Sequence, residues 1–473
     1  MAEEFAKYIG ADVNFTLTTQ TGVSKKDAKP SDPQPKMKLT AEEQEIYDGK
    51  KGPLLQKLMK SVVVYGEMFG ADKLVDLTGP VHMALAWGSK GVIPLLEIFE
   101  QLVDAGLKTY KPFTADPKVM DYEHNLPGPD KRKLFEETYS EQERLEGLLL
   151  KLGLIDSDSF SCSTYLPEVG NAPKKGDYMA WTESSAINYT NSAIGSRTNR
   201  NSIGLDMMCN ILGKAPYFGL MTDEGRKAKW LIDVRTTKKP VGMLLGSAIG
   251  LKVMEDVPYI AGIEGFLNEL NEEQRTSYLK DMGATTASNG AVGLYHIEGI
   301  TPEAKDQGRD LLVENYQTYV IDDAELERVY DSYPDLWPDH NKGPKQVFIG
   351  CPHLTVDQLR YSAERIEQGL KDAGLSKTAL PVSLFAGKKV TDAFVKRYPK
   401  ESKFFDDIGA KIVHGCPPMY LTGPGMKDEL TITSSNKCRV YSLARFFFDE
   451  SLLEIILTGK LPQGYLKEQS QNE

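Results

Sequence analysis

Three of the five cysteines in this 473-residue chain stand in loop-like sequences that suit metal chemistry. Cys162 lies in SCSTYLPEVG, Cys351 in GCPHL and Cys416 in HGCPPM. A proline after Cys351 and after Cys416 removes a backbone donor and fixes the turn. A lone cysteine is more often a small buried apolar residue, which is how we interpret Cys209, whereas Cys438 is ambiguous. Three thiolates from separate loops would suit an iron–sulfur cluster that leaves one iron open.

A dense polar block follows the first of these cysteines. The block DYMAWTESSAINYTNSAIGSRTNRNSIG holds Glu183, Ser184, Ser185, Asn188, Asn191, Arg197, Thr198, Asn199 and Arg200. Residues three or four apart share a helix face, so Glu183, Asn188 and Asn191 are predicted to line one side of a helix. Arg197 and Arg200 flank a glycine-containing turn and could each fork onto a carboxylate or a phosphate. The interleaved Ala, Ile and Tyr residues favour burial, while a solvated polar helix and loop is an equally good interpretation.

The chain has six histidines, and one of them stands beside a cysteine of interest. His82 lies in TGPVHMAL, His296 in GLYHIEGITPEA, and His353 two positions after Cys351. A solitary histidine is more often a hydrogen-bonded structural residue than a catalyst, so His353 is favoured because of its neighbour. No prediction is attached to the remaining three, His124, His340 and His414.

The last third of the chain indicates how two of the thiols are positioned. Apolar runs at 346–350, 379–387 and 410–415 predict buried strands, and amphipathic segments between them predict helices. Alternating strands and helices imply right-handed crossovers and a parallel sheet. Cys351 follows the first strand and Cys416 follows the third. Because ligands gather beyond the carboxyl ends of parallel strands, we expect these two thiols to meet at one sheet edge.

Helix starts are marked by three possible capping boxes: Thr40 with Glu43, Ser140 with Glu143, and Thr355 with Gln358. The helical segment after Thr40 is predicted to break near Gly52 and Pro53. Gly153 is predicted to end the helix that Ser140 opens. Residues 20–38 are polar and carry three prolines, which is typical of a linker or an extension.

Composition excludes several function classes. Hydrophobic residues make up 41% and charged residues 26%, and the formal net charge is -11. A surface of this sign repels phosphate backbones and anionic membranes, so we expect neither nucleic acid nor membrane as a partner. The N-terminus is acidic where a secretory signal needs basic residues, and an odd number of cysteines makes no disulfide framework. A cytoplasmic location is expected. No CxxC, HExxH or phosphate-loop spacing occurs.

Five stretches together resemble the large subunit, or catalytic domain, of the aconitase X family. They are VHMA around His82, CSTYLPEVG with AWTESSAINYTNSAIGSRTNR, HIEGITPEA, GCPHLTVDQL, and HGCPPM through TSSNK. The polar block is the most specific of these, because it is long and chemically unusual. The resemblance implies an α/β fold of aconitase-like, multi-unit architecture with parallel-sheet units. We expect an N-terminal extension over 1–38, an aconitase-like α/β region with the polar block over 39–335, and an α/β unit with two cluster cysteines over 336–473.

The resemblance also implies a function. Members of the family are hydro-lyases, or dehydratases, that hold an iron–sulfur cluster through three cysteines and remove water from a hydroxy carboxylic acid. The known substrate classes are mevalonate 5-phosphate and cis-3-hydroxy-L-proline. The resemblance does not decide between a four-iron and a two-iron cluster. One iron would act as a Lewis acid on the departing hydroxyl. A separate small swivelling subunit is the expected partner, since in relatives that domain supplies a serine for proton transfer.

Residue roles are carried over by motif position. The implied metal ligands are Cys162, Cys351 and Cys416. The implied catalytic residues are Glu183, Ser184, His353 and Lys437. The implied substrate-binding residues are His82, Thr114, Ser185, Asn188, Arg197, Thr198, Asn199, Arg200 and Ser435.

Some positions depart from the family pattern. The family has a Thr-Thr-Leu-Asn-like segment where this chain has PFTADPKVMD, in which Thr114 and Asp116 keep the polar character. Asn436 replaces a glycine, and the segment 451–459 lacks a cysteine found near the C-terminus of the family. These departures leave an alternative hypothesis, in which the protein has no cluster and uses the scaffold for binding or regulation.

A cofactor-free acid–base lyase is a further alternative. Its reaction would depend on His82, Glu183 and Lys437, and it would survive chelation and the loss of Cys351.

Overall fold

The computed structural model describes residues 34–84, 87–124, 128–339 and 342–462. Most of the predicted extension over 1–38 lies outside these ranges, as does His340. Residues 34–36 belong to a first unit, Met1–Lys36, and every element below belongs to the second, Met37–Glu473. Met37 itself is buried among the apolar side chains of α2 and α3.

The first helices begin as predicted. These are α2 (Ala41–Tyr47) and α3 (Pro53–Met68). Thr40 caps α2 and forms the capping box with Glu43, which is thereby confirmed. Gly52 precedes α3 and Pro53 takes its first position, so the predicted break is also confirmed.

The next helices are α4 (Ile93–Asp104), α5 (Pro129–Thr138) and α6 (Gln142–Leu152). The predicted capping box at Ser140 is wrong, because Glu141 is the cap residue of α6 and makes no side-chain cap bond. Contacts with Gly88 take its place: the Glu141 amide donates to the Gly88 carbonyl, and the Gly88 amide donates to Gln142 Oε1. Gly153 ends the helix at φ 120°, as predicted.

Two small strand pairs support the polar block. β1 (Leu74–Asp76) lies antiparallel to β4 (Lys214–Pro216), and β2 (Val81–Met83) lies parallel to β3 (Phe113–Ala115). The block itself contains α7 (Ser184–Tyr189), which a short π-helical segment, Thr190–Ile194, continues. α8 (Ile203–Leu212) follows it.

A four-stranded parallel sheet has the order β7-β6-β5-β8. Its strands are β5 (Ala228–Val234), β6 (Pro258–Ala261), β7 (His296–Ile297) and β8 (Leu312–Ile321). Its helices are α9 (Gly242–Val253), α10 (Glu264–Asn268), α11 (Glu272–Asn289), α12 (Pro302–Gln307) and α13 (Asp323–Asp331). A Cβ at Gly246 would come within 2.2 Å of the Met282 carbonyl oxygen, so glycine permits the close packing of α9 on α11.

A five-stranded parallel sheet has the order β11-β10-β9-β12-β13. Its strands are β9 (Gln346–Ile349), β10 (Val382–Phe385), β11 (Lys411–Val413), β12 (Thr431–Thr433) and β13 (Arg445–Phe446). Its helices are α14 (Val356–Asp372), α15 (Lys388–Arg397), α16 (Pro399–Ile408), α17 (Pro417–Leu421), α18 (Asn436–Tyr441) and α19 (Asp449–Thr458). The three predicted strands, the predicted helices and the capping box at Thr355 are confirmed.

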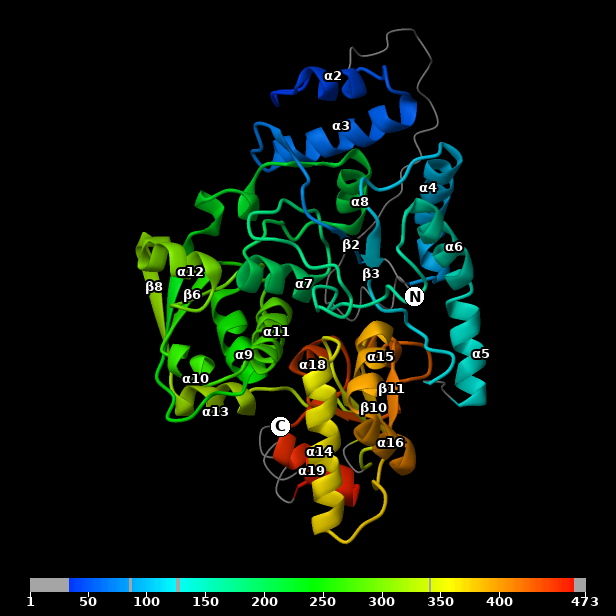
Figure 1. Ribbon diagram of the computed structural model, residues 1–473, viewed down its shortest axis with the longest axis vertical. Coiled ribbons are helices and arrows are strands. Elements are labelled where there is room, and N and C mark those ends of the chain that lie inside the picture. Colours follow the sequence, from blue (N-terminus) through cyan, green and yellow to red (C-terminus); the bar gives the residue numbers. More distant parts are fainter. Residues whose placement is uncertain (1–33, 85–86, 125–127, 340–341, 463–473) are drawn as a thin grey trace. The chain divides into compact units, whose positions relative to one another are not determined.

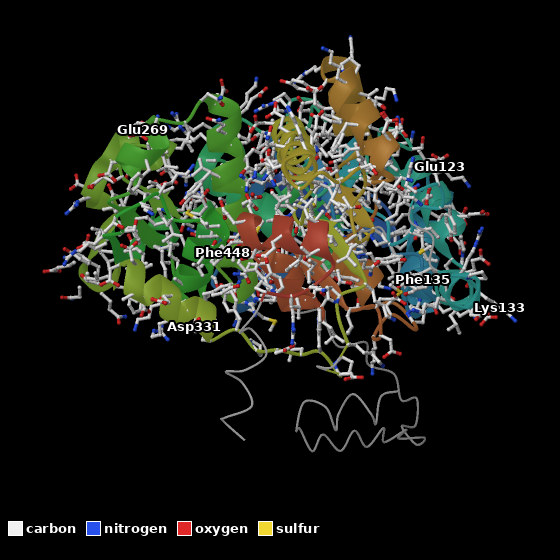
Figure 2. All side chains as sticks on the ribbon, turned by 90° about the horizontal axis from the view of Figure 1, so that it is seen from below. Glu123, Lys133, Phe135, Glu269, Asp331 and Phe448 are labelled. Atoms are coloured by element: carbon white, nitrogen blue, oxygen red, sulfur yellow. The ribbon has the colours of Figure 1, made fainter. Side chains whose placement is uncertain are left out.

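The two sheets meet through helices. α11 contacts both α7 and α18, and Figure 1 shows α7 and α11 between the green strands β6 and β8 and the orange strands β10 and β11. Seen from below in Figure 2, Glu269 and Asp331 lie on one flank, and Lys133 and Phe135 lie on the opposite flank. Among the helices of the described ranges, none is both long enough and apolar enough to cross a bilayer.

Candidate active site

A cavity of about 720 Å³ brings together polar residues from stretches that are far apart in sequence. The polar and thiol side chains in its lining include Asp116, Cys162, Thr182, Glu183, Ser184, Arg200, Cys351, His353, Cys416 and Lys437. Most of the lining surface is nevertheless apolar, which is typical of sites that bind small molecules.

All three predicted metal-ligand cysteines line this cavity. Cys351 follows β9, and Cys416 follows β11 as the cap residue of α17. Cys162 lies in the loop that begins beside β3, where Ala115 pairs with Phe160. Cys162 and Cys351 are buried and Cys416 is half-buried.

The spacing of the thiols bears on what they can bind. Among the described residues, the one group whose donor atoms all lie within 4.8 Å of one another is Asp121, His124 and His414, and not the cysteines. A single tetrahedral ion at about 2.3 Å from each sulfur would hold sulfurs about 3.8 Å apart. At least one pair of these sulfurs is therefore further apart than a single tetrahedral ion would hold them. Cys209 and Cys438 are buried and do not line the cavity, although Cys438 packs in the same apolar cluster as Cys351.

His353 connects the three cysteine loops. Its backbone amide donates to Cys162 Sγ at 3.2 Å, and its Nε2 lies 3.0 Å from the Gly415 carbonyl oxygen. Because a carbonyl only accepts, Nε2 carries the proton, and Nδ1 accepts from Ser161 Oγ at 3.3 Å. Burial lowers the pKa of His353 to about 4, so the ring is neutral at pH 7. The His353 ring is thus held neutral and in one orientation in the cavity lining.

Glu183 and Lys437 form an ion pair in the cavity wall. Lys437 Nζ donates to Glu183 Oε1 at 2.6 Å and to Ser185 Oγ at 3.2 Å, while Ser185 Oγ donates to Glu183 Oε2 at 2.7 Å. Glu183 also caps α7 by accepting from the Ala186 amide. Burial raises the pKa of Glu183, but Lys437 and these hydrogen bonds lower it more, to about 2. Both groups are therefore charged at pH 7.

Ser435 and Ser184 support this pair. Ser435 caps α18, which carries Lys437, and its hydroxyl donates to the Cys351 carbonyl oxygen. Ser184 lines the cavity and donates to Glu183 Oε1 at 3.4 Å. The loop after β12 is thereby tied to the loop after β9.

Asp116 is a cavity residue to which the sequence assigned no role. It directly follows β3, and its Oδ1 lies 3.1 Å from His82 Nε2. His82 is fully buried, and its Nδ1 lies 2.9 Å from Thr114 Oγ1. Thr114 in turn lies 2.6 Å from Thr164 Oγ1 and accepts from Asn171. His82 and Thr114 thus support Asp116 from behind and do not line the cavity. The signal for Asp116 was its place in the altered PFTADPKVMD segment.

Most of the polar block faces inward instead of into the cavity. Asn188 donates to Thr286 Oγ1 and to the Val292 carbonyl oxygen. Asn191 donates to the carbonyl oxygens of Thr198 and Gly293. The predicted shared helix face is wrong, because Glu183 precedes α7 as its cap while both asparagines point into packed backbone.

The remaining predicted binding residues separate into two groups. Thr198 accepts from the Trp181 amide, and Asn199 binds the backbone at Phe218. The Arg197 guanidinium donates to the Met221 carbonyl oxygen and to Asp223, and it does not line the cavity. Arg200 does line it, is exposed, and donates to the Ala287 carbonyl oxygen at 3.0 Å.

Comparisons with known proteins agree on one family. Residues 36–224 match the family model for the aconitase X first domain, and residues 228–331 match that for the aconitase X second domain. The chain is 33% identical over 330 residues to the phosphomevalonate dehydratase large subunit of Thermococcus kodakarensis, covering 69% of this chain and 77% of the relative. It is 26% identical over 372 residues to the cis-3-hydroxy-L-proline dehydratase of Hypocrea jecorina, covering 76% and 59%.

A solved structure is also similar. The holo-form of aconitase X from Thermococcus kodakaraensis superposes with a TM-score of 0.72 at 28% sequence identity. The match covers 88% of this chain and 99% of that chain.

Proposed function

The chain belongs to the aconitase X family and is a hydro-lyase, and from this premise we propose that it dehydrates a phosphorylated hydroxy acid of the mevalonate 5-phosphate type. The predicted resemblance, enzyme class and aconitase-like α/β architecture are confirmed. The relatives named phosphomevalonate dehydratase large subunit support the proposed substrate. The match covers a larger share of their length than of the length of the cis-3-hydroxy-L-proline dehydratase.

We propose that Cys162, Cys351 and Cys416 hold an iron–sulfur cluster. The support is that three thiols on three separate loops line one cavity. Burial raises the pKa of all three thiols, that of Cys351 to about 12, while the Lys437 ammonium acts in the opposite direction on Cys162 and Cys351. A bound cluster would supply a Lewis-acid iron for the departing hydroxyl.

Two carboxyl groups in the cavity are suited to different tasks. Glu183 stays ionised because of Lys437, so its role is to hold that ammonium toward the substrate. Burial raises the pKa of Asp116, His82 lowers it, and the Glu183 charge raises it again, with a net upward shift. A carboxyl group whose pKa is raised is suited to move a proton near neutral pH. We therefore assign proton transfer at the substrate to Asp116, and orientation of Asp116 to His82 and Thr114.

Two cations can hold an anionic substrate. Lys437 is buried beside the thiols, while Arg200 is exposed at the cavity margin. A guanidinium has five N–H donors in a planar fork, which suits a phosphate. We propose that Arg200 binds the phosphate and that Lys437 faces the carboxylate. In this arrangement Ser184 and His353, implied by the resemblance as catalytic, and Ser185 and Ser435, implied as substrate-binding, become positioning residues.

A small subunit is the proposed protein partner. The support is the phrase "large subunit" in the names of the archaeal relatives. Free thiols at the site also favour a reducing compartment, and we propose the cytoplasm.

The test is an assay of the chain made anaerobically together with its candidate small subunit. We expect loss of water from mevalonate 5-phosphate and none from cis-3-hydroxy-L-proline. Activity on hydroxyproline alone would overturn the substrate assignment. A thermal shift with either compound and no water elimination would instead favour a binding protein, and activity that survives full removal of iron would favour a cofactor-free lyase.

A further inference from the structure

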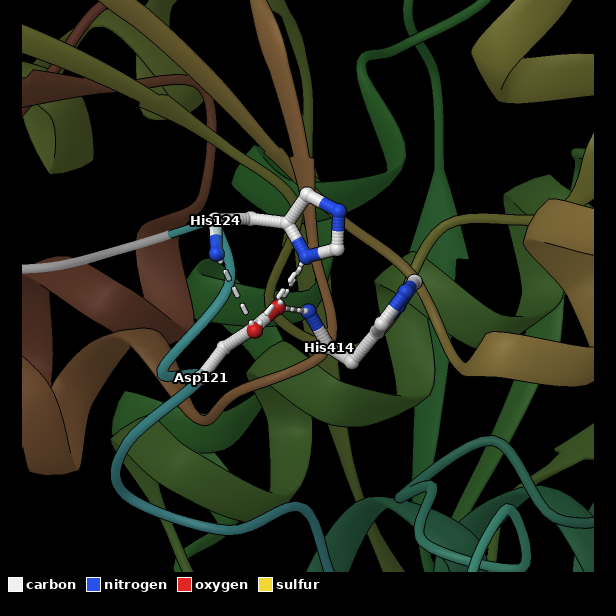
Figure 3. A group of neighbouring side chains, drawn as sticks. All are labelled: Asp121, His124 and His414. Carbon is white, nitrogen blue, oxygen red and sulfur yellow. Dashed lines mark hydrogen bonds and ion pairs between the residues drawn. The ribbon is translucent and has the colours of Figure 1, made fainter.

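A second cluster of metal-binding side-chain types lies outside the cavity lining. It consists of Asp121, His124 and His414, shown in Figure 3. One donor atom of each lies within 4.8 Å of the donor atoms of the other two. His124 Nδ1 is 3.0 Å from Asp121 Oδ2, and the two imidazole rings have their centres 5.3 Å apart. The described residues that line the cavity include none of the three.

His414 is held in the form that a metal ligand needs. Its Nδ1 lies 3.0 Å from the Ala386 carbonyl oxygen. Because a carbonyl only accepts, Nδ1 carries the proton and Nε2 keeps its lone pair. A hydrogen bond from the second ring nitrogen to a backbone carbonyl is the usual arrangement around metal-bound histidines. The His414 amide also donates to Asp121 Oδ2 at 2.9 Å, which holds ring and carboxylate together.

Local turn structure accounts for only part of this cluster. Asp121 accepts from the amides of Glu123 and His124 at 3.1 and 3.2 Å, as an aspartate does in a turn. These bonds do not account for the ring nitrogen of His414, which lies within 4.8 Å of the Asp121 and His124 donor atoms although its segment is 290 positions away. The Asp121 side chain is only 8% exposed, whereas that of His124 is 39% exposed, so an ion could enter from the His124 side.

The distances suit a small divalent ion. A tetrahedral ion at about 2.0 Å from each ligand holds neighbouring ligand atoms about 3.3 Å apart. The separations of 3.0 and 3.2 Å between His124 Nδ1 and the Asp121 oxygens are close to that value, and an ion would replace the proton of this hydrogen bond, which leaves to solvent. The remaining ligand atom, a ring nitrogen of His414, lies within 4.8 Å of the other two and would move closer when an ion binds.

We propose that Asp121, His124 and His414 bind one divalent transition-metal ion, with zinc as the best match and water at the remaining position. Two imidazoles and one carboxylate suit zinc and its neighbours, whereas magnesium and calcium prefer oxygen ligands only. The proposal of a metal ion here does not rest on the proposed dehydration activity.

The ion would brace the loop that carries Cys416. The Cys416 amide donates to the Lys118 carbonyl oxygen at 2.7 Å, so the segment before Asp121 already packs on that loop. An ion shared by Asp121, His124 and His414 would add a second connection between the same two segments.

The test is a count of bound zinc on the anaerobically purified holoenzyme after equilibrium dialysis against Zn²⁺. We expect one zinc per chain with the iron content unchanged. The variants His124→Gln and His414→Gln should each weaken zinc binding at least about tenfold. His414→Gln keeps a side-chain donor near the Ala386 carbonyl oxygen, and Glu123→Gln, which changes an exposed neighbour, should bind zinc like the parent chain.

Several results would overturn the proposal. They are no zinc bound, zinc bound equally by the double variant His124→Gln/His414→Gln, zinc bound only as iron is lost, and magnesium bound as tightly as zinc. Thermal unfolding checks the fold independently. Added zinc should raise the Tm of the parent chain and of Glu123→Gln, and it should leave the Tm of the double variant unchanged.

Discussion

The five-stranded sheet and the polar block at 177–204 both contribute to the cavity, but they do so from different positions. In the sheet, the contributing residues directly follow strands: Cys351 after β9, Cys416 after β11 and Lys437 in the helix after β12. In the block, Glu183 at the start of α7 lines the cavity, whereas the asparagines within and beyond that helix bind backbone. The position of a polar residue at an element end therefore indicates a place in the cavity lining better than a high local density of polar residues does.

The largest effect should come from a strand-end thiol. Replacing Cys351 by Ser should remove the proposed cluster and lower kcat by at least about 10⁴-fold, because the Lewis acid contributes several kcal/mol to the transition state. Iron content and kcat measured on the same preparation check this prediction. The matched control is Cys209→Ser, since Cys209 is buried in α8 among apolar side chains and does not line the cavity. Equal iron loss in both variants would show a general loss of packing instead.

The next effect concerns the charged pair that joins the two regions. Glu183→Gln leaves the buried Lys437 ammonium without its counter-charge, so the free energy of unfolding should fall by about 3–5 kcal/mol. Denaturant unfolding measures it. Glu364→Gln, which breaks the exposed pair with Arg360, should cost no more than about 1 kcal/mol. A similar loss in both variants would contradict the account.

The same pair predicts a pH dependence. The fold lowers the pKa of Glu183 from 4.5 to about 2, so its stabilising contribution is present above pH 4.5 and is lost as the pH falls toward 2. Unfolding of the parent chain should become easier across that window, and Glu183→Gln should show a weaker dependence there. Parallel curves for the two proteins would contradict the assignment.

Asp116 should affect turnover more than binding. Asp116→Asn keeps an oxygen toward His82 Nε2 but cannot transfer a proton, so kcat should fall about 10²- to 10³-fold with KM little changed. Steady-state kinetics with the small subunit present separate the two parameters. A change confined to KM would assign Asp116 to substrate binding instead.

The smallest effect comes from a matched pair of arginines within the polar block. Arg200→Lys should raise KM for the phosphorylated substrate about tenfold, because an ammonium cannot fork onto a phosphate. Arg197→Lys should leave KM unchanged, since Arg197 donates to Met221 and Asp223 and does not line the cavity. Equal effects on KM would remove the distinction between the two positions.

Features set by neighbouring residues were predictable from the sequence. The capping boxes at Thr40 and Thr355 depend on residues three positions apart, and both are present. The box at Ser140 is absent because Gly88, far along the chain, binds the first turn of α6. The pattern of the last third predicts its parallel sheet, whereas the four-stranded sheet around β5 has no comparably clear alternation of strands and helices.

Long-range contacts account for the parts of the site that the sequence could not predict. His124 and His414 stand in unrelated segments, and only the packing of residues 118–121 against the Cys416 loop brings them together. Asn188 and Asn191 have the residue type of ligand-binding side chains, but burial against backbone carbonyls decides their role. Family resemblance identified the three thiols, and the coordinates add that they share one cavity.

The most direct measurement of iron binding by Cys351 and Cys416, the thiols that follow strands, is a count of iron and acid-labile sulfide on the chain purified without oxygen. The account predicts several iron atoms per chain, sulfide in similar amount, and loss of both in Cys351→Ser. A colourless, iron-free protein that catalyses dehydration at full rate would contradict it.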